Sequence, residues 1–259
     1  MIAIIGMGVV GSAIYNSVSD GLLNSVLCFD ESPKLKTFNS ATSNDAMKAD
    51  IIFVAVPTPT TDDGQDLSIL IKILDTLSYK KYEGVIVINS TILEVLNTKY
   101  PKLKIVISPE FLNATTASED FKNSKYIVLG GDAIHTSFVR KMYGHYFEFN
   151  NKVKYEMCTA QEAIDFKYLR NVKQAYNLMF WEFIQDQTGN SRKLANMLSN
   201  IPASENSISG LDGYRGYGQS NDKDASNFSA CLDKDIRAWD NFKDHELLKF
   251  LKEYNKKIG

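Results

Sequence analysis

Three glycines and one aspartate near the N-terminus have the types and spacing to bind a phosphorylated ligand. Gly6, Gly8 and Gly11 are spaced as G-x-G-x-x-G, between the apolar run 2–5 and a helical pattern. The first glycine allows a tight turn, the second lets a pyrophosphate approach the backbone, and the third lets helix pack on strand. The phosphates would lie on unpaired N–H groups at the start of the helix. Asp30 ends the next apolar run, where a carboxylate can bind an adenosine ribose and repel a 2′-phosphate.

This pattern predicts a dinucleotide site that prefers NAD to NADP. The residues expected to contact the cofactor are Gly6, Met7, Gly8, Val9, Val10, Gly11 and Asp30. The alternative is a glycine-rich turn in an α/β protein that binds no dinucleotide.

Length and composition are typical of a soluble enzyme with one large domain or two modest ones. The 259 residues are 44% hydrophobic and carry a net charge of −2, without a long run of one sign, so no nucleic-acid partner is expected. Cys28, Cys158 and Cys231 have no metal-ligand spacing, which favours a reducing cytosol over a disulfide framework. No apolar run is long enough to span a membrane, and Met1 leads directly into the first strand. We therefore expect no cleaved signal, no membrane partner and a cytoplasmic location.

Strands and helices alternate along the first part of the chain. Strands are expected at 2–5, 26–29, 50–56, 85–89, 104–108 and 126–129. Helices are expected at 67–77 and 133–143, and a helix with a loop at 32–44. This alternation predicts a doubly wound parallel sheet, here a Rossmann domain over residues 1–155. A proline-containing loop at 57–60 leaves the carboxyl end of one strand, where open α/β sheets bind ligands. Pro57 and Thr58 are therefore added to the cofactor site.

From about residue 156 the pattern becomes all-helical. Residues 159–188 contain no proline or glycine and carry apolar residues at helical spacing, which predicts one long helix ended by Gly189. Shorter helices are expected at 191–198, 225–239 and 245–256, and a loop at 200–223. A long helix with aromatic residues along it is typical of a buried spine or a dimer face. The second domain is therefore placed at 156–259.

Motifs at three successive strand ends resemble those of the UDP-glucose/GDP-mannose 6-dehydrogenase family. They are V-P-T-P at 56–59, S-T at 90–91 and P-E-F-L at 109–112, and the combination is far more specific than the glycine motif. The resemblance covers the whole chain and implies a two-step, NAD-dependent oxidation of a nucleotide-sugar C6 alcohol to a carboxylate. It also implies that the family's C-terminal domain would begin about where this sequence stops. The second domain would then be the family's central domain, which binds substrate and forms the dimer.

The resemblance implies a role for each matching residue. Thr91 and Glu110 match the pair that positions and activates a water, and Thr91 also borders the cofactor; the alternatives are a helix cap and a carboxylate in a surface loop. Lys167 and Asn171, which share a helix face, match the pair that binds the C6 oxygen; the alternative is a solvated polar face. The positions expected to contact substrate are Phe111, Leu112, Asn113, Lys167, Asn171 and Gly218.

The family's nucleophile loop, G-F-G-G-S-C-F-P-K-D, is matched to a degraded stretch at 216–224. Counting back from Asp224, which then matches the family's carboxylate or caps the next helix, puts Ser220 in place of the cysteine. Counting forward puts Asn221 there. Serine has a far higher pKa than cysteine, and asparagine is no nucleophile. Cys231 lies about two helical turns beyond Asp224 and is expected to be a poor substitute.

Two more positions depart from the family pattern. Ala114 stands where the family has a second glutamate, and Asn89 replaces the usual lysine before S-T. The differences together predict alcohol–aldehyde oxidation, with acid formation very slow or absent. A non-catalytic protein that binds NAD or a nucleotide sugar is the alternative, and V-P-T-P and P-E-F-L disfavour another dehydrogenase of the same superfamily. Because the family dimerises through its long helix, a homodimer through residues 159–188 is expected.

Overall fold

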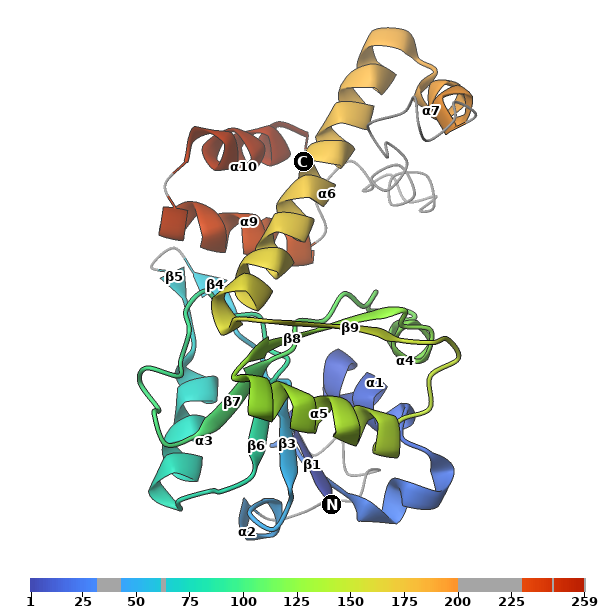
Figure 1. Cartoon of the computed structure of the whole chain (residues 1–259). Coiled ribbons are helices and arrows are strands. Elements are labelled where there is room, and N and C mark those ends of the chain that lie inside the picture. The colour runs from blue at the N-terminus through green and yellow to red at the C-terminus, as the bar shows by residue number, and fades with distance from the viewer. Residues whose placement is uncertain (32–42, 62–63, 200–229, 244, 259) are drawn as a thin grey trace. The chain divides into compact units, whose positions relative to one another are not determined.

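The computed structural model describes residues 1–31, 43–61, 64–199, 230–243 and 245–258 (Figure 1). The chain divides into two compact units. The first, called the α/β unit below, consists of Met1–Pro59 and Gln65–Lys167, and the second, the helical unit, of Thr60–Gly64 and Tyr168–Gly259. The division between them falls inside the long helix, whereas the domain boundary expected near residue 155 stays a prediction.

The α/β unit is built on a seven-stranded sheet in the order β2-β1-β3-β6-β7-β8-β9. The strands are β1 (Ile2–Ile5), β2 (Val26–Phe29), β3 (Ile51–Val54), β6 (Val85–Ile88), β7 (Lys104–Ile107), β8 (Tyr126–Gly131) and β9 (Lys154–Cys158). The first five strands are parallel, so the expected doubly wound parallel sheet is confirmed.

The last two strands depart from that pattern. β8 is antiparallel to β7, and β9 pairs parallel with β8. The connection from β7 to β8 contains only one helix, the six-residue α4 (Ala117–Lys122). A helix of six residues rises only about 9 Å, so the chain is still near the carboxyl edge when β8 begins. β9 was not expected from the sequence, because it lies at the sheet edge and carries no continuous apolar run.

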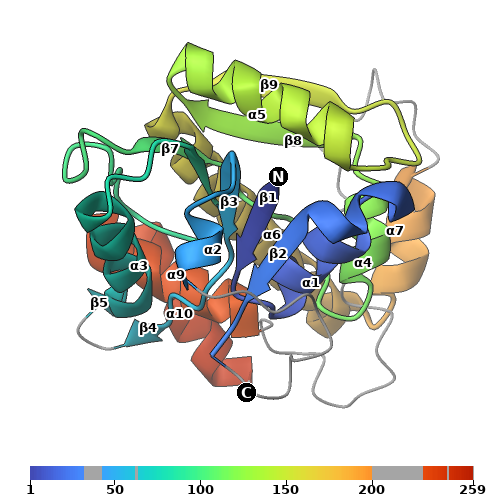
Figure 2. The ribbon, with the colours of Figure 1, turned by 90° about the horizontal axis from the view of Figure 1, so that it is seen from below.

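Helices cover both sides of the central strands. The helices of this unit are α1 (Val9–Asn16), the 3₁₀ helix η1 (Asp20–Ser25), α2 (Ser43–Ala46), α3 (Ser68–Tyr79), α4 and α5 (Ala133–Tyr146). The helices expected at 67–77 and 133–143 are confirmed, whereas most of the one expected at 32–44 lies outside the described residues. Figure 2 shows α1 and α3 on opposite sides of β1 and β3.

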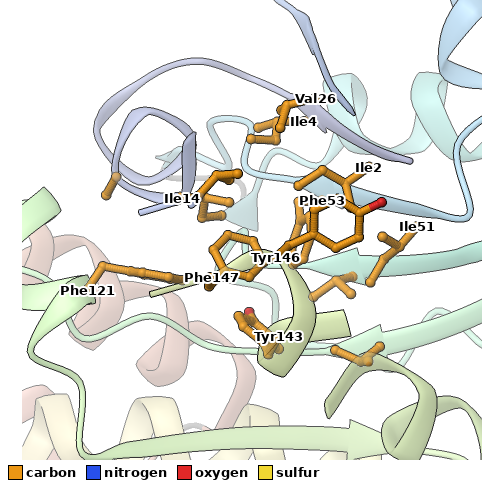
Figure 3. Packing of buried hydrophobic residues seen from close by; sticks show 14 of the residues in the cluster. Ile2, Ile4, Ile14, Val26, Ile51, Phe53, Phe121, Tyr143, Tyr146 and Phe147 are labelled. Atoms are coloured by element: carbon orange, nitrogen blue, oxygen red, sulfur yellow. The ribbon is translucent and has the colours of Figure 1, made fainter. Parts of the chain in front are cut away.

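Alternate positions of the parallel strands form one hydrophobic core with α1 and α5. Ile2, Ile4 and Phe53 point to the same face and pack with Ile14 of α1 and Tyr143 of α5 (Figure 3). The ring of Phe53 meets that of Tyr143 edge-on, with centroids 5.7 Å apart. This packing holds the strand ends, and therefore the loops that follow them, in one register.

The helical unit has a small core of its own. Its elements are the short strand β4 (Thr60–Thr61), which pairs with β5 (Gly64–Gln65), most of α6 (Ala160–Thr188), α7 (Ser191–Ser199), α9 (Ala230–Lys243) and α10 (Glu246–Ile258). Ala175 of α6 packs with Leu232 and Ile236 of α9 and Leu251 of α10. The long helix and the two terminal helices are thus confirmed, and the loop expected at 200–223 lies outside the described residues.

Candidate active site

The sheet register brings the residues that follow the parallel strands to one edge. The last residues of the five strands lie in one row, as Phe29, Ile5, Val54, Ile88 and Ile107. The residues directly after them are Asp30, Gly6, Ala55, Asn89 and Ser108. β1 lies between β2 and β3, so the chain connections diverge from it in opposite directions. Open α/β sheets bind ligands in the crevice that such a divergence leaves at the carboxyl ends.

The glycine turn has the shape that a pyrophosphate needs. Gly6 has φ +90°, and a Cβ there would lie 2.5 Å from the carbonyl oxygen of Ala55. A Cβ on Gly11 would lie 1.8 Å from the carbonyl oxygen of Gly6, so the turn itself requires both glycines. A Cβ on Gly8 would meet no described atom within 4 Å. That open space lies at the N-terminus of α1, next to Val9 and Val10, where a phosphate can reach backbone N–H groups.

Asp30 lies between the glycine turn and an apolar cavity of about 350 Å³. Its Oδ2 accepts a hydrogen bond of 2.7 Å from the backbone N–H of Met7. The cavity is lined by Gly6, Asp30, Glu31, Val56 and Pro57, and by one face of α3 that includes Ile69, Lys72 and Ile73. The polar group at its rim and the apolar wall suit an adenosine, so the residues fit NAD. The sequence analysis did not assign this face of α3 to the cofactor site. The helical spacing of its residues after V-P-T-P could have indicated it.

The loops after β3 and β6 are tied to each other. The hydroxyl of Thr58 donates to the carbonyl oxygen of Thr91 at 2.6 Å, and the Gln65 amide donates to the same oxygen at 2.9 Å. No helix begins in the described stretch between β6 and β7, so the alternative role of Thr91 as a helix cap is wrong. Pro57, Thr58 and Thr91 therefore belong to one connected loop system at the carboxyl edge.

Glu110 is a partly buried carboxylate with two neighbours from distant parts of the chain. Its Oε1 accepts a hydrogen bond of 3.0 Å from Nδ2 of Asn89, and its backbone carbonyl accepts one from the ammonium of Lys167. Burial raises the pKa of Glu110 to about 7, against the opposing effects of Lys167 and Asn89. The hydrogen bond from Asn89 and the partial burial distinguish Glu110 from a fully solvated loop carboxylate. A pKa near neutrality suits a general base.

The P-E-F-L loop is held by aromatic and polar contacts. The ring of Phe111 meets that of Phe166 edge-on at 5.7 Å, and Nζ of Lys167 lies 5.2 Å from the centroid of Phe111. The N–H of Asn113 donates to Asp120 at 2.9 Å. Leu112 is half-buried against the sheet core. Phe166 was missed as part of this cluster, because its helical spacing had suggested only core packing.

In the helical unit, Asn171 is buried rather than solvated, with 4% of its surface exposed. Its Nδ2 donates to Oδ2 of Asp235 at 2.6 Å, and Lys234 forms an ion pair of 2.7 Å with Oδ1 of the same carboxylate. Asp235 is itself buried. The expected polar pair is therefore divided: Lys167 contacts Glu110 in the α/β unit, and Asn171 contacts Asp235 in the helical unit.

The residues first matched to the nucleophile loop, Gly218, Ser220, Asn221 and Asp224, lie outside the described residues. The contact between Asn171 and Asp235 draws attention to a different stretch. Residues 231–235 read C-L-D-K-D, with cysteine, lysine and aspartate at the spacing of the family's C-F-P-K-D. Cys231 lies in the first turn of α9. The spacing of these three residues could have identified the stretch from the sequence alone. The glycine-rich residues at 216–218 favoured the match to 216–224 instead.

Comparisons with known proteins find similar sequences and structures. Residues 20–147 match the NAD binding domain of the UDP-glucose/GDP-mannose dehydrogenase family. The chain is similar to this dehydrogenase family over that stretch. The expectation of NAD as cofactor is confirmed by the description of the matched domain. Among the helices of the described residues, none is long and apolar enough to cross a membrane.

Two curated relatives and a solved structure give the extent of the likeness. The UDP-glucose 6-dehydrogenase of Rickettsia prowazekii is 30% identical over 178 residues, which are 64% of this chain and 40% of that protein. The Rickettsia felis enzyme of the same name is 29% identical, over 64% of this chain and 38% of its own length. A UDP-glucose dehydrogenase structure from Pyrobaculum islandicum superposes with a TM-score of 0.74 at 19% identity, covering 99% of this chain and 68% of that one. The chain thus spans about two fifths of the curated relatives, and the solved structure supports the fold.

Proposed function

We propose that this chain is an NAD-dependent dehydrogenase that acts on the C6 alcohol of a nucleotide sugar. The observation that carries the proposal is the meeting of Asn89, Glu110 and Lys167 at the carboxyl edge of the sheet. That edge also holds the glycine turn and Asp30, so a tuned base and a cation lie in the unit that binds the cofactor. NAD⁺, when bound, supplies the acceptor for a hydride.

The first oxidation needs a hydride acceptor and groups that accept the proton and the developing charge of the alcohol. The ammonium of Lys167 and the amide of Asn171 would hydrogen-bond the C6 oxygen and stabilise negative charge on it as its proton leaves. Glu110, with a pKa of about 7, can accept a proton from a water that Thr91 helps to position. Phe111, Leu112 and Asn113 would hold the sugar against these groups.

For the second oxidation we propose Cys231, in place of Ser220, as the nucleophile. Its thiolate would add to the aldehyde carbon and form a C–S bond, while the aldehyde oxygen takes up a proton to give a thiohemiacetal. Loss of that proton, with transfer of a hydride from the same carbon to a second NAD⁺, would give a thioester. Water would then break the C–S bond, releasing the acid and restoring the thiol. The N-terminal turn of a helix favours an anion such as a thiolate. The contact of Asn171 with Asp235, four residues after Cys231, supports this assignment.

The hydrolysis step is the one that we expect to be impaired. The sequence predicted slow acid formation because a cysteine was missing from the nucleophile loop. With Cys231 as the nucleophile, that reason no longer applies. Ala114 still lacks the second carboxylate of the family pattern P-E-F-L-x-E. One fewer acid beside the reacting water predicts slow acid formation after a normal first oxidation.

The experiment is to follow NADH absorbance with a panel of UDP-, GDP- and CDP-sugars and to count NADH and acid formed per sugar. We expect a rapid first phase and a slow release of acid in the wild type. Cys231→Ala should abolish acid formation and the covalent adduct seen by intact mass, whereas Ser220→Ala and the control Cys158→Ala should keep both. Loss of the adduct in Ser220→Ala alone would contradict the assignment of Cys231.

A second candidate is a protein that binds NAD or a nucleotide sugar without turnover, which the alanine at 114 favours. The two candidates differ in a simple pair of measurements. NAD⁺ would raise the melting temperature under both, because a ligand that binds only the native state stabilises it. Turnover of no sugar in the panel, together with that shift, would select the binding role.

We also propose that two copies of the chain associate through α6. The exposed large apolar side chains of this helix include Leu169 (57%), Tyr176 (47%), Phe180 (41%) and Phe183 (53%). Their spacing places them on one side of the helix. A continuous exposed apolar stripe favours a protein partner over solvent, and a second copy would bring an identical stripe to it.

A further inference from the structure

Asn89 makes two contacts that link neighbouring strand ends. It directly follows β6 and has 4% of its surface exposed. Its Nδ2 donates to the carbonyl oxygen of Ser108 at 2.9 Å and to Oε1 of Glu110 at 3.0 Å. One amide nitrogen therefore ties the end of β7 to the carboxyl group two residues beyond it.

A buried polar cluster lies with Asn89 under the carboxyl edge. Oδ1 of Asn89, Oγ of Ser108 and the hydroxyl of Tyr143 are buried, and none has a hydrogen-bond partner among the described residues. Burial and the charge of Glu110 raise the pKa of Tyr143, while Ser108 and Asn89 lower it. The side chains of Glu110, Ser108 and Asn89 therefore lie near the Tyr143 hydroxyl. This hydroxyl remains protonated and able to donate.

We propose that Asn89 is a positioning residue for Glu110: its amide nitrogen, held by the carbonyl oxygen of Ser108, presents a donor to the carboxyl group. The inference rests on the proposed function. An amide turned by 180° would place Oδ1 against both the Glu110 carboxylate and the Ser108 carbonyl, which repel it. The two hydrogen bonds of Nδ2 oppose that rotation, since Oδ1 is an acceptor and cannot donate to either oxygen.

The choice of a neutral amide at this position has a chemical consequence. Lysine, the usual residue of the family here, would place a second cation beside Glu110 in addition to Lys167 and would keep the carboxylate ionised. Asp120 and Lys125 line a cavity of about 220 Å³ together with Glu110. With asparagine, Glu110 stays a base that exchanges its proton near neutral pH.

The test measures protonation of Glu110 directly, by difference infrared spectroscopy of the carboxyl band against pH. The band is assigned by its loss in Glu110→Gln. Asn89→Leu removes the amide donor at similar volume and should raise the titration midpoint by about one pH unit, the effect of one hydrogen bond to a charged group. Asn89→Lys should lower the midpoint. Asn97→Leu is the matched control, because Asn97 caps the carbonyl oxygen of Ile105 and should leave the midpoint unchanged.

Two further measurements keep the result decisive. If Asn89→Leu does not fold, Asn89→Asp keeps the side-chain shape, places a second carboxylate against Glu110 and should raise the midpoint still more. The pH profile of acid formation should move with the infrared midpoint in every variant that turns over. A midpoint unmoved in folded Asn89→Leu or Asn89→Asp would overturn the positioning role. Wild-type protein with no turnover of any sugar, but with the midpoint shifts as expected, would instead refute the proposed function alone.

Discussion

Glu110 shows how a single residue can be predicted by type and yet need its surroundings for a role. Its place in P-E-F-L marked it as a base, but only the folded chain supplies Asn89, Lys167 and the burial that raises its pKa to about 7. Asn89 was noted from the sequence only as a departure from lysine. The partner that it contacts is 21 residues away, a separation over which local pattern carries no information on contact.

A stability measurement checks the raised pKa of Glu110. Because its folded pKa of about 7 lies above its ordinary value of 4.5, the group stabilises the fold below pH 4.5 and loses that contribution as pH rises through 7. The difference in unfolding free energy between wild type and Glu110→Gln should therefore fall between these pH values, by at most about 3 kcal/mol. Urea unfolding at a series of pH values measures it. The exposed control Glu94→Gln should show a flat difference, and a flat difference for Glu110→Gln would contradict the shift.

The glycine turn gives a second prediction at the residue scale. Gly11→Ala would place a methyl group 1.8 Å from the Gly6 carbonyl oxygen, which must then move and distort the turn. We expect NAD⁺ affinity to fall at least about tenfold, with a destabilisation of about 1–3 kcal/mol. Gly21→Ala is the control, since a Cβ there meets no described atom within 4 Å. Calorimetry with NAD⁺ measures the affinity, and equal affinity in both variants would be inconsistent with the proposed role of the turn.

At the scale of elements, the strands were predicted well where they are buried on both faces. β1, β3 and β6 are continuous apolar runs with every residue buried, and such runs are visible in the sequence. β9 is half-exposed and has no such run, and the reversal of β8 depends on where α4 leaves the chain. Edge pairing and strand direction arise from the assembled sheet, so neither could be predicted.

The contact between α6 and α9 gives a prediction for this scale. Asn171→Ala would leave the buried Asp235 with Lys234 as its remaining partner. An under-satisfied buried carboxylate should destabilise the helical unit by about 1–3 kcal/mol. Asn177→Ala, a partly exposed site on the same helix, should change stability by less than about 0.5 kcal/mol. Thermal unfolding followed by circular dichroism compares the two, and equal melting temperatures would show that the Asp235 contact adds no stability.

For the whole molecule, the proposed dimer gives a prediction on assembly. Phe180→Glu puts a charge into the exposed apolar stripe of α6 and should convert the dimer to a monomer at micromolar concentration, since a charge is costly to bury in an apolar interface. Gln174→Glu places the same side chain on the other side of the helix and should keep the dimer. Light scattering at several concentrations measures the mass. A wild-type monomer at all concentrations would refute association through this helix.

The sequence alone determined the positions of the buried strands along the chain and the glycine turn with Asp30. It also marked Glu110, Lys167 and Asn171 as candidates. The strands and the turn depend on local pattern: apolar runs, residue spacing and turn chemistry within a few tens of residues. The three candidate residues depend on the resemblance of their motifs to those of the family. The tertiary structure decided which groups share a site. It paired Asn89 with Glu110 and Asn171 with Asp235, and that second contact is what drew attention to Cys231. Burial and contacts between distant residues set these pairings, and both exist only once the strands and helices have packed together.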